Sequence, residues 1–430
     1  MKKILLVIAN MIALTCAMSD WQLVIPPRLA IYDVLSILFI VVWLLFYSTK
    51  KVLLNKDIKL FMSLEWAYFA IMVMSGINIV LIYNSQESFV QFYKGISSNG
   101  MYVAFASCFC MFMHELEPRE RNQILAFFIA GVIFSSLYGI LGSILYKSYN
   151  LRIETFWNYV SYNVGPRYDE SLDWQVMGIR RGFGFPGINA AATYNMTAIP
   201  LLLLYALYRG RLKDYLYCSI CFVGLLVTLS RTGFITFIVS LIALFVLTFK
   251  EMKSAVFKLL IFASPFIAMG YIWWEYVTEI MRHRAIALDA RSAVWESGLA
   301  LFFDNPFLGL GVNNYSVVRE TLASQYFHEA NLHNSWLTIL VELGPVGLIC
   351  YVVFVAFIVW KATIRPSILS KGFVCAIVGL SVGAISNQLF DSFYFQFFIT
   401  LVFSMVALGD GQFLNTQHYR SPKPLALRGI

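Results

Sequence analysis

Residues 334–360 read NSWLTILVELGPVGLICYVVFVAFIVW, a long apolar run whose single charged side chain is Glu342. An α-helix needs about 20 apolar residues to cross roughly 30 Å of hydrocarbon, so this stretch predicts a membrane-spanning helix. Runs of the same kind recur along the chain and are separated by short polar segments. Strands of a membrane β-barrel would alternate apolar and polar residues over about ten positions, and these runs do not. The pattern therefore predicts an all-α polytopic membrane protein.

The composition agrees with a chain that lies mostly in lipid. Of its 430 residues, 59% are hydrophobic and only 13% are charged, whereas a soluble domain carries about 25% charged residues. A net charge of +8 would suggest nucleic acid in a soluble protein. In a membrane protein it instead raises the question of which side holds the cations, and we expect no nucleic-acid partner.

The apolar runs predict about twelve transmembrane helices, with both termini in the cytoplasm. The expected spans are residues 4–24, 31–48, 60–82, 97–113, 122–146, 187–208, 214–230, 232–249, 256–274, 334–360, 372–389 and 393–409. They divide the chain into N-terminal helices (1–146), a long external loop (147–186), central helices (187–274), a second long loop (275–333), C-terminal helices (334–411) and a cytoplasmic tail (412–430). A signal peptide is the alternative for the first run. We expect the run to be retained, because the charge distribution requires it as the first span.

That distribution follows the positive-inside rule. With this topology, about two thirds of the 32 Lys and Arg residues face the cytoplasm, as the rule requires. Lys predominates on the cytoplasmic side and Arg on the external side. Because the planar guanidinium group suits phosphate and carboxylate, an Arg-rich external face suggests an anionic ligand. Pairing with acids of the same loops, such as Asp169 and Glu275, is the equally weighted alternative.

The two long external loops are rich in aromatic residues, which argues against disorder. Long loops in a compact fold usually carry function. The second loop has a helical pattern from Arg291 to Phe303, followed by a turn at Asp304-Asn305-Pro306. We interpret it as a partly helical cap over a membrane cavity.

Ser230-Arg231-Thr232-Gly233 links two apolar runs almost without a loop. An Arg at membrane depth is costly and is by default a functional hypothesis. Ser230 or Thr232 could cap the following helix, whose first N–H groups would form an anion site together with the guanidinium group. The alternative is an Arg that extends to the lipid headgroups.

His333-Asn334 lies where the second external loop returns to the membrane. A neutral imidazole at this position could accept the proton of a sugar hydroxyl as a general base. A histidine that only caps its helix is the alternative. Arg180-Arg181, directly before a Gly-rich stretch, and Arg291 are further candidates for anion binding.

Metal ligands are not suggested by the sequence. The external segments contain no HExxH, DxD or paired-His spacing, and the Cys218-x-x-Cys221 spacing lies within an apolar run, where ordinary packing explains it. We expect chemistry without metal or cofactor.

In this order, these segments resemble the superfamily of O-antigen ligases and Wzy-type O-antigen polymerases. The resemblance covers roughly residues 180–360. It rests on Ser230-Arg231-Thr232-Gly233, on the segment from Arg291 to Gly311 that ends in Asn-Pro-Phe-Leu-Gly-Leu-Gly, and on His333-Asn334 followed by Glu342-Leu343-Gly344-Pro345-Val346-Gly347.

The resemblance implies a C-type glycosyltransferase fold in the bacterial inner membrane, with a periplasmic cap. It implies inverting, metal-independent transfer of a glycan from undecaprenyl diphosphate to a sugar hydroxyl. On the family pattern His333 is the catalytic base and Arg231 binds the diphosphate. Arg181 and Arg291 match the pattern less closely, and Arg180 and Asn334 are substrate-binding candidates by position. Membrane lipid and a chain-length regulator protein are further expected partners.

The resemblance does not decide which molecule supplies the acceptor hydroxyl. A ligase transfers the glycan to lipid A core, whereas a polymerase transfers it to a lipid-linked repeat. Gly187-Ile188-Asn189-Ala190-Ala191 resembles the polymerase branch and favours that interpretation. A flippase of lipid-linked oligosaccharides is the main rival class, but it would place charges near the midplane and show inverted repeats. A membrane acyltransferase would pair a His with an acid such as Asp391, and the Arg-rich face argues against it.

Overall fold

The computed structural model describes residues 1–17, 30–47, 52–83, 85–149, 188–228, 230–248, 285–322, 331–365, 367–387, 389–390 and 392–410. These residues form thirteen α-helices and one π-helical segment. The elements are α1 (Lys2–Thr15), α2 (Ile31–Tyr47), α3 (Lys56–Asn78), η1 (Ile79–Tyr83), α4 (Gln86–Glu115), α5 (Pro118–Tyr149), α8 (Ile188–Arg209), α9 (Leu212–Thr228), α10 (Arg231–Thr248), α12 (Ala285–Asp304), α13 (Tyr315–Leu322), α14 (Ser335–Thr363), α15 (Ile368–Gly383) and α16 (Phe393–Ala407).

The protein is an all-helical polytopic membrane protein, as the sequence predicts. Among the described residues, five segments are long and apolar enough to cross a membrane: Lys56–Tyr83, Gln86–Glu115, Pro118–Gly142, Ala191–Arg209 and Ser335–Thr363. Four shorter apolar helices accompany them: Ile31–Tyr47, Thr232–Thr248, Ile368–Gly383 and Phe393–Ala407. The expected span 256–274 and residues 150–186 of the first long loop lie outside the described residues, whereas residues 147–149 still belong to α5.

Several helix ends differ from the expected ones, for local reasons. Helix α4 begins well before residue 97, because Ser85 accepts a hydrogen bond from the Ser88 N–H group and caps the helix. Helix α15 begins before residue 372 because Ser367 caps it in the same way, and it ends at Gly383, before residue 389. Hydropathy alone does not report such capping residues.

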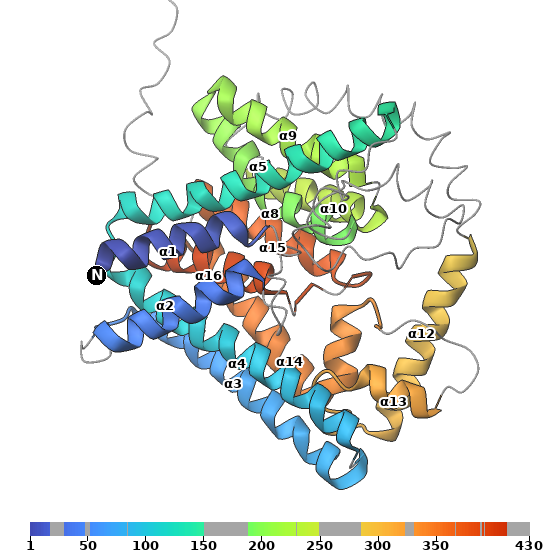
Figure 1. Ribbon diagram of the computed structural model, residues 1–430. Helices are drawn as coiled ribbons and strands as arrows, with labels where there is room; N and C mark the ends of the chain where they lie inside the picture. Colours follow the sequence, from blue (N-terminus) through green and yellow to red (C-terminus); the bar gives the residue numbers. More distant parts are fainter. Residues whose placement is uncertain are drawn as a thin grey trace, which may run out of the picture.

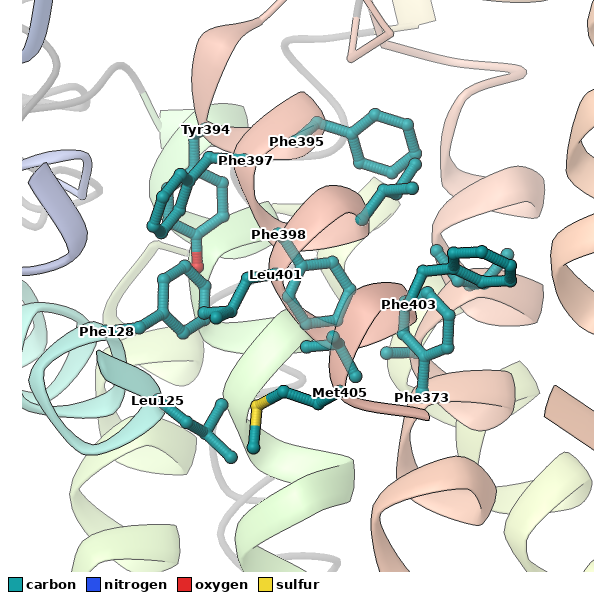
Figure 2. Close-up of a cluster of buried hydrophobic side chains, with 14 of the residues drawn as sticks. Leu125, Phe128, Phe373, Tyr394, Phe395, Phe397, Phe398, Leu401, Phe403 and Met405 are labelled. Atoms are coloured by element: carbon teal, nitrogen blue, oxygen red, sulfur yellow. The ribbon is translucent and has the colours of Figure 1, made fainter. Parts of the chain in front are cut away.

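Helix α16 forms the centre of one half of the bundle and packs against α3, α4, α5, α14 and α15. It is buried along its whole length, and its side chains extend to several sides of the helix (Figure 2). Phe397 packs against Phe109 of α4 and Phe128 of α5, and Phe398 packs edge-on against Phe373 of α15. Interlocking aromatic rings of this kind fix the rotation of a helix in its bundle.

Helix α8 is the second central element, because every residue from 191 to 206 is buried. It packs against α5, α9, α10 and α15. Its polar side chains meet partners inside the bundle: Ser136 of α5 donates to Asn195 at 2.6 Å, and the Thr197 hydroxyl pairs with Tyr394 of α16. The helix therefore contacts protein on all sides.

The ion pairs of the described residues gather at one end of the bundle. Lys2 pairs with Glu120 at 2.7 Å, and Arg121 donates through Nη2 to Asp410 at 2.8 Å. Asp57 pairs with Lys361 at 2.9 Å and with Arg365. The starts of α1, α3 and α5 and the ends of α14 and α16 therefore lie together, at the end that the sequence assigns to the cytoplasm. Helices α12 and α13 lie on the side away from the N-terminus (Figure 1).

Candidate functional site

His333 and Asn334 lie directly before α14, away from its charged end. Asn334 is the N-cap residue, and its Oδ1 atom accepts a hydrogen bond from the Leu337 N–H group at 3.0 Å. His333 is half-buried and has a φ of 50°, in the left-handed region that side chains other than glycine rarely adopt. An unusual backbone conformation that is fixed by its surroundings is frequent at functional sites.

The first residue of α14, Ser335, fixes this turn to the chain that follows α15. Its N–H group donates to the Ala384 carbonyl at 2.8 Å. Its hydroxyl donates to the Asn387 carbonyl at 2.9 Å and accepts from the Leu389 N–H group at 2.7 Å. The position of His333 therefore depends on Ala384, Asn387 and Leu389.

Arg231 is the first residue of α10. The expected cap is present, since the Ser230 Oγ atom accepts a hydrogen bond from the Gly233 N–H group at 3.2 Å. Thr232 instead bonds across helices, with its hydroxyl 2.7 Å from that of Ser386. The backbone of Arg231 is thereby placed, whereas its side chain lies outside the described part of the chain.

Close packing of α10 against α15 holds this arrangement. Thr232, Thr236 and Ser240 lie one helical turn apart along α10 and face the Gly379-x-x-x-Gly383 pair of α15. A Cβ atom on Gly379 would lie 2.7 Å from the Thr236 carbonyl oxygen and would also meet the Ser240 hydroxyl. Small residues on both sides let the two backbones approach closely, a recurring feature of helix pairs in membranes.

The starts of α10 and α14 thus meet at the same end of α15. Ser386 contacts Thr232, and the next residue, Asn387, contacts Ser335. The two segments that the sequence analysis singled out most strongly, around Arg231 and His333, therefore share one supporting stretch of chain.

Helix α12 brings Arg291 to the same neighbourhood. The Trp295 Nε1–H group donates to the Leu332 carbonyl at 2.9 Å, directly before His333. Arg291 precedes Trp295 by four residues, so the two lie one turn apart on the same face of α12. The helix predicted around Arg291 to Phe303 is confirmed. The side chain of Arg291, and all of Arg180 and Arg181, lie outside the described residues.

The Asn305-to-Gly311 motif docks onto a break in α14. Gly344, directly before Pro345, has a φ of 69°, and the helix changes direction there. The Leu310 N–H group donates to the Val341 carbonyl and the Gly311 N–H group to the Glu342 carbonyl, both at 2.9 Å. The two motifs that carry the family resemblance in this region therefore bind each other through their backbones.

Two glycines permit this close docking. Gly309 has a φ of 67°, and a Cβ atom there would lie 2.5 Å from the Glu342 carbonyl carbon. A Cβ atom on Gly344 would meet the Phe307 carbonyl oxygen. Only glycine fits at either position.

Glu342 has a role that the sequence analysis missed. Its carboxylate accepts hydrogen bonds from the Asn313 N–H group at 2.8 Å and the Tyr315 N–H group at 3.2 Å, at the start of α13. An acid at a helix N-terminus is stabilised by the free N–H groups and by the helix dipole. The sequence signal was the lone charge in residues 334–360, but nothing in the sequence indicated its partner.

The same segment also contacts the end of α3. Asn78 donates to the Gly309 carbonyl at 2.6 Å, and Asn305 donates to the Tyr83 hydroxyl at 2.7 Å. Tyr83 ends the π-helical segment η1, a type of irregularity that is frequent near functional sites. Residues 305–315 therefore join the α3–α4 hairpin to α14. Among the described residues, no group of three or more His, Cys, Asp or Glu side chains is placed to hold a metal ion.

The helical fold and a comparison with protein families define a membrane enzyme of the glycosyltransferase type. Residues 216–352 match the family model described as O-antigen ligase, Wzy_C. This match confirms the resemblance predicted from the motifs. The match includes most of α9, all of α10, α12 and α13, and α14 as far as residue 352. No curated protein matches the chain.

Proposed function

We propose that the protein is a C-type glycosyltransferase with about twelve membrane spans, which transfers a glycan from undecaprenyl diphosphate to a sugar hydroxyl at the periplasmic face of the bacterial inner membrane. The observation that supports this most directly is the shared support of Arg231 and His333 by residues 384–389. A diphosphate donor requires a cation that binds it, and a hydroxyl acceptor requires a base. The proposal places both groups at one end of the bundle. The charged end with the ion pairs then faces the cytoplasm, with both termini.

In the proposed reaction, His333 takes the proton of the acceptor hydroxyl as its oxygen attacks the anomeric carbon. The bond between that carbon and the diphosphate oxygen breaks, and undecaprenyl diphosphate leaves with the electron pair. Attack from the face opposite the leaving group inverts the anomeric configuration. The Arg231 guanidinium group stabilises the charge that develops on the diphosphate, and a fixed cavity aligns the two reactants.

Further side chains complete the proposed substrate contacts. Arg291, one turn before Trp295 on α12, and Arg180 and Arg181 of the first long loop supply additional positive charge for the donor. Asn334 contributes its amide nitrogen, because its amide oxygen already accepts from Leu337.

We propose a Wzy-type polymerase, with O-antigen ligase as the second candidate. The Gly187-to-Ala191 sequence favours the polymerase, whereas the matched family model is described as O-antigen ligase. Purified protein in liposomes, supplied with lipid-linked repeats alone, distinguishes the two. A polymerase forms a ladder of longer glycans from the repeats, whereas a ligase yields product only when lipid A core is added.

The proposed base is tested with His333→Asn. Asparagine tolerates left-handed backbone better than most residues, so the turn should persist while the base is lost. Glycan transfer should fall by about 100-fold or more with the protein still folded in the membrane. Normal transfer by this variant would remove His333 from the mechanism.

A further inference from the structure

Glu65 is a buried acid in the membrane-spanning part of α3, and the proposed reaction does not use it. Its side chain is almost completely buried, with the residue 6% exposed. Its Oε2 atom has no hydrogen-bond partner among the described residues. An ionised carboxylate without a partner is strongly disfavoured in such a place, so the neutral carboxylic acid is the stable form.

The carboxyl group lines a small cavity between α3, α4, α14 and α16. Its volume of about 20 Å³ is enough for at least one water molecule, which needs roughly 10–15 Å³ and two to four polar partners. The polar lining residues come from all four helices and are Glu65, Tyr68, Asn99, Tyr102, Tyr351 and Gln396. The cavity lies outside the contacts that support Arg231 and His333.

The titratable groups around Glu65 are all uncharged in their ordinary state at neutral pH. They are Tyr68 on α3 itself, Tyr102 and Cys110 on α4, and Tyr351 on α14. From α16 the cavity is lined by the neutral Gln396. Among the described lining residues there is no Lys, Arg or His to stabilise a carboxylate.

We propose that Glu65 and this cavity form a proton-binding site inside the membrane. The neutral carboxylic acid donates its proton to cavity water, and that water is held by the surrounding hydroxyl and amide groups. Uptake and release of the proton pass through this water. The site does not depend on the proposed glycan transfer, since it uses none of the same residues.

Dicyclohexylcarbodiimide tests the proposal, because this apolar reagent reacts with neutral carboxylic acids inside membranes. The acid proton passes to a carbodiimide nitrogen, and the carboxylate oxygen adds to the central carbon. The product rearranges to a stable N-acylurea that retains all atoms of both reactants. Full-length protein in liposomes is treated between pH 6 and 10, and each acid is followed by peptide mass spectrometry.

We expect Glu65 to be modified at least ten times faster than Glu342 at pH 6.5, with the rate falling as the pH rises. Glu342 is the matched internal control, because its two carboxyl oxygens already accept hydrogen bonds from two backbone N–H groups. Glu65→Gln, a neutral substitution of the same shape, should abolish modification of that peptide and leave glycan transfer unchanged.

Two results would overturn the proposal. One is an unmodified Glu65 at pH 6.5, with the reagent active on other acids of the same sample. The other is protection of Glu65 when sodium chloride replaces choline chloride, since this would mean that the cavity holds a metal cation against a carboxylate. Both results are measured as modification of Glu65 in the unsubstituted protein. They therefore do not depend on whether a variant folds.

Discussion

The Oγ1 atom of Thr232 and the Oγ atom of Ser386 lie 2.7 Å apart, a contact that joins the first turn of α10 to the end of α15. The next residue, Asn387, accepts a hydrogen bond from Ser335 at the start of α14. Residues 384–389 lie beyond the part of the chain that matches the family model. The proposed site therefore depends on a support that the matched domain does not contain.

Ser335→Ala tests this support. The hydroxyl satisfies the Asn387 carbonyl and the Leu389 N–H group, and both are left without this partner when it is removed. We expect a loss of about 1–3 kcal/mol in the free energy of unfolding. Because displacement of a catalytic group by about 1 Å can cost 100-fold in rate, transfer should fall by roughly tenfold or more. Turnover in liposomes and thermal unfolding in detergent measure the two effects.

Thr363→Ala is the matched control. Its hydroxyl is exposed at the other end of α14 and only donates to the Val359 carbonyl within the helix. This variant should leave the rate of glycan transfer and the free energy of unfolding unchanged. Equal effects of the two variants would show that Ser335 has no special role in placing His333.

Gly379→Ala should weaken the crossing of α10 and α15. The added methyl group meets the Thr236 carbonyl oxygen and the Ser240 hydroxyl, and forced overpacking typically costs about 1–3 kcal/mol. The measurement is resistance to unfolding by SDS. Ile238→Ala, on the exposed face of α10, should have little effect, and the prediction fails if the two variants unfold alike.

Glu342→Gln should loosen the segment that joins α3 to α14. An amide can accept only one of the two hydrogen bonds through its oxygen, and bonds to a charged group are worth about 1.5–3 kcal/mol each. We expect faster amide hydrogen exchange at Asn313 and Tyr315 and a lower unfolding temperature. Val346→Ala, one turn along the same helix and 55% exposed, is the control and should leave the exchange unaltered.

The two ion pairs of α5 should differ sharply in their contribution to stability. Asp410→Asn leaves the Arg121 guanidinium group buried without its counter-charge, a change that typically costs about 3–5 kcal/mol. Glu120→Gln breaks the partly exposed pair with Lys2, and about 0–1 kcal/mol is usual for a pair near the surface. Thermal unfolding of both variants in the same detergent tests the contrast, and a similar loss for both would contradict it.

Much of the helical fold can be predicted from the sequence, because burial in lipid imposes long apolar runs. Residues 31–48 and 334–360 were placed to within a few positions of α2 and α14. The break at Gly344 was not predicted, since the apolar pattern continues through it. Its cause is a docked segment more than 30 residues earlier in the chain, a contact that hydropathy does not encode.

The candidate site, like the fold, could be predicted from the sequence only in part. The motifs around Arg231 and His333 were identified from residue chemistry and family resemblance, and the Ser230 cap was among the expected possibilities. Residues 384–389 were assigned only to a span, because serine and asparagine near a helix end carry no distinctive signal. Their importance appears only when the ends of α10, α14 and α15 meet in three dimensions.

The complete burial of helix α8 has a consequence for how the protein is assembled in the membrane. Residues 191–206 are covered on all sides, yet α9, α10 and α15, three of the helices that cover them, are synthesised later. Thr197 meets its partner Tyr394 only when α16 has been synthesised. Until then the Thr197 hydroxyl keeps its bond to the Tyr194 carbonyl of its own helix but lacks its partner on α16. A chain truncated before α15 therefore leaves α8 facing lipid on sides that protein normally covers, a surface that membrane proteases and chaperones can recognise as unfinished.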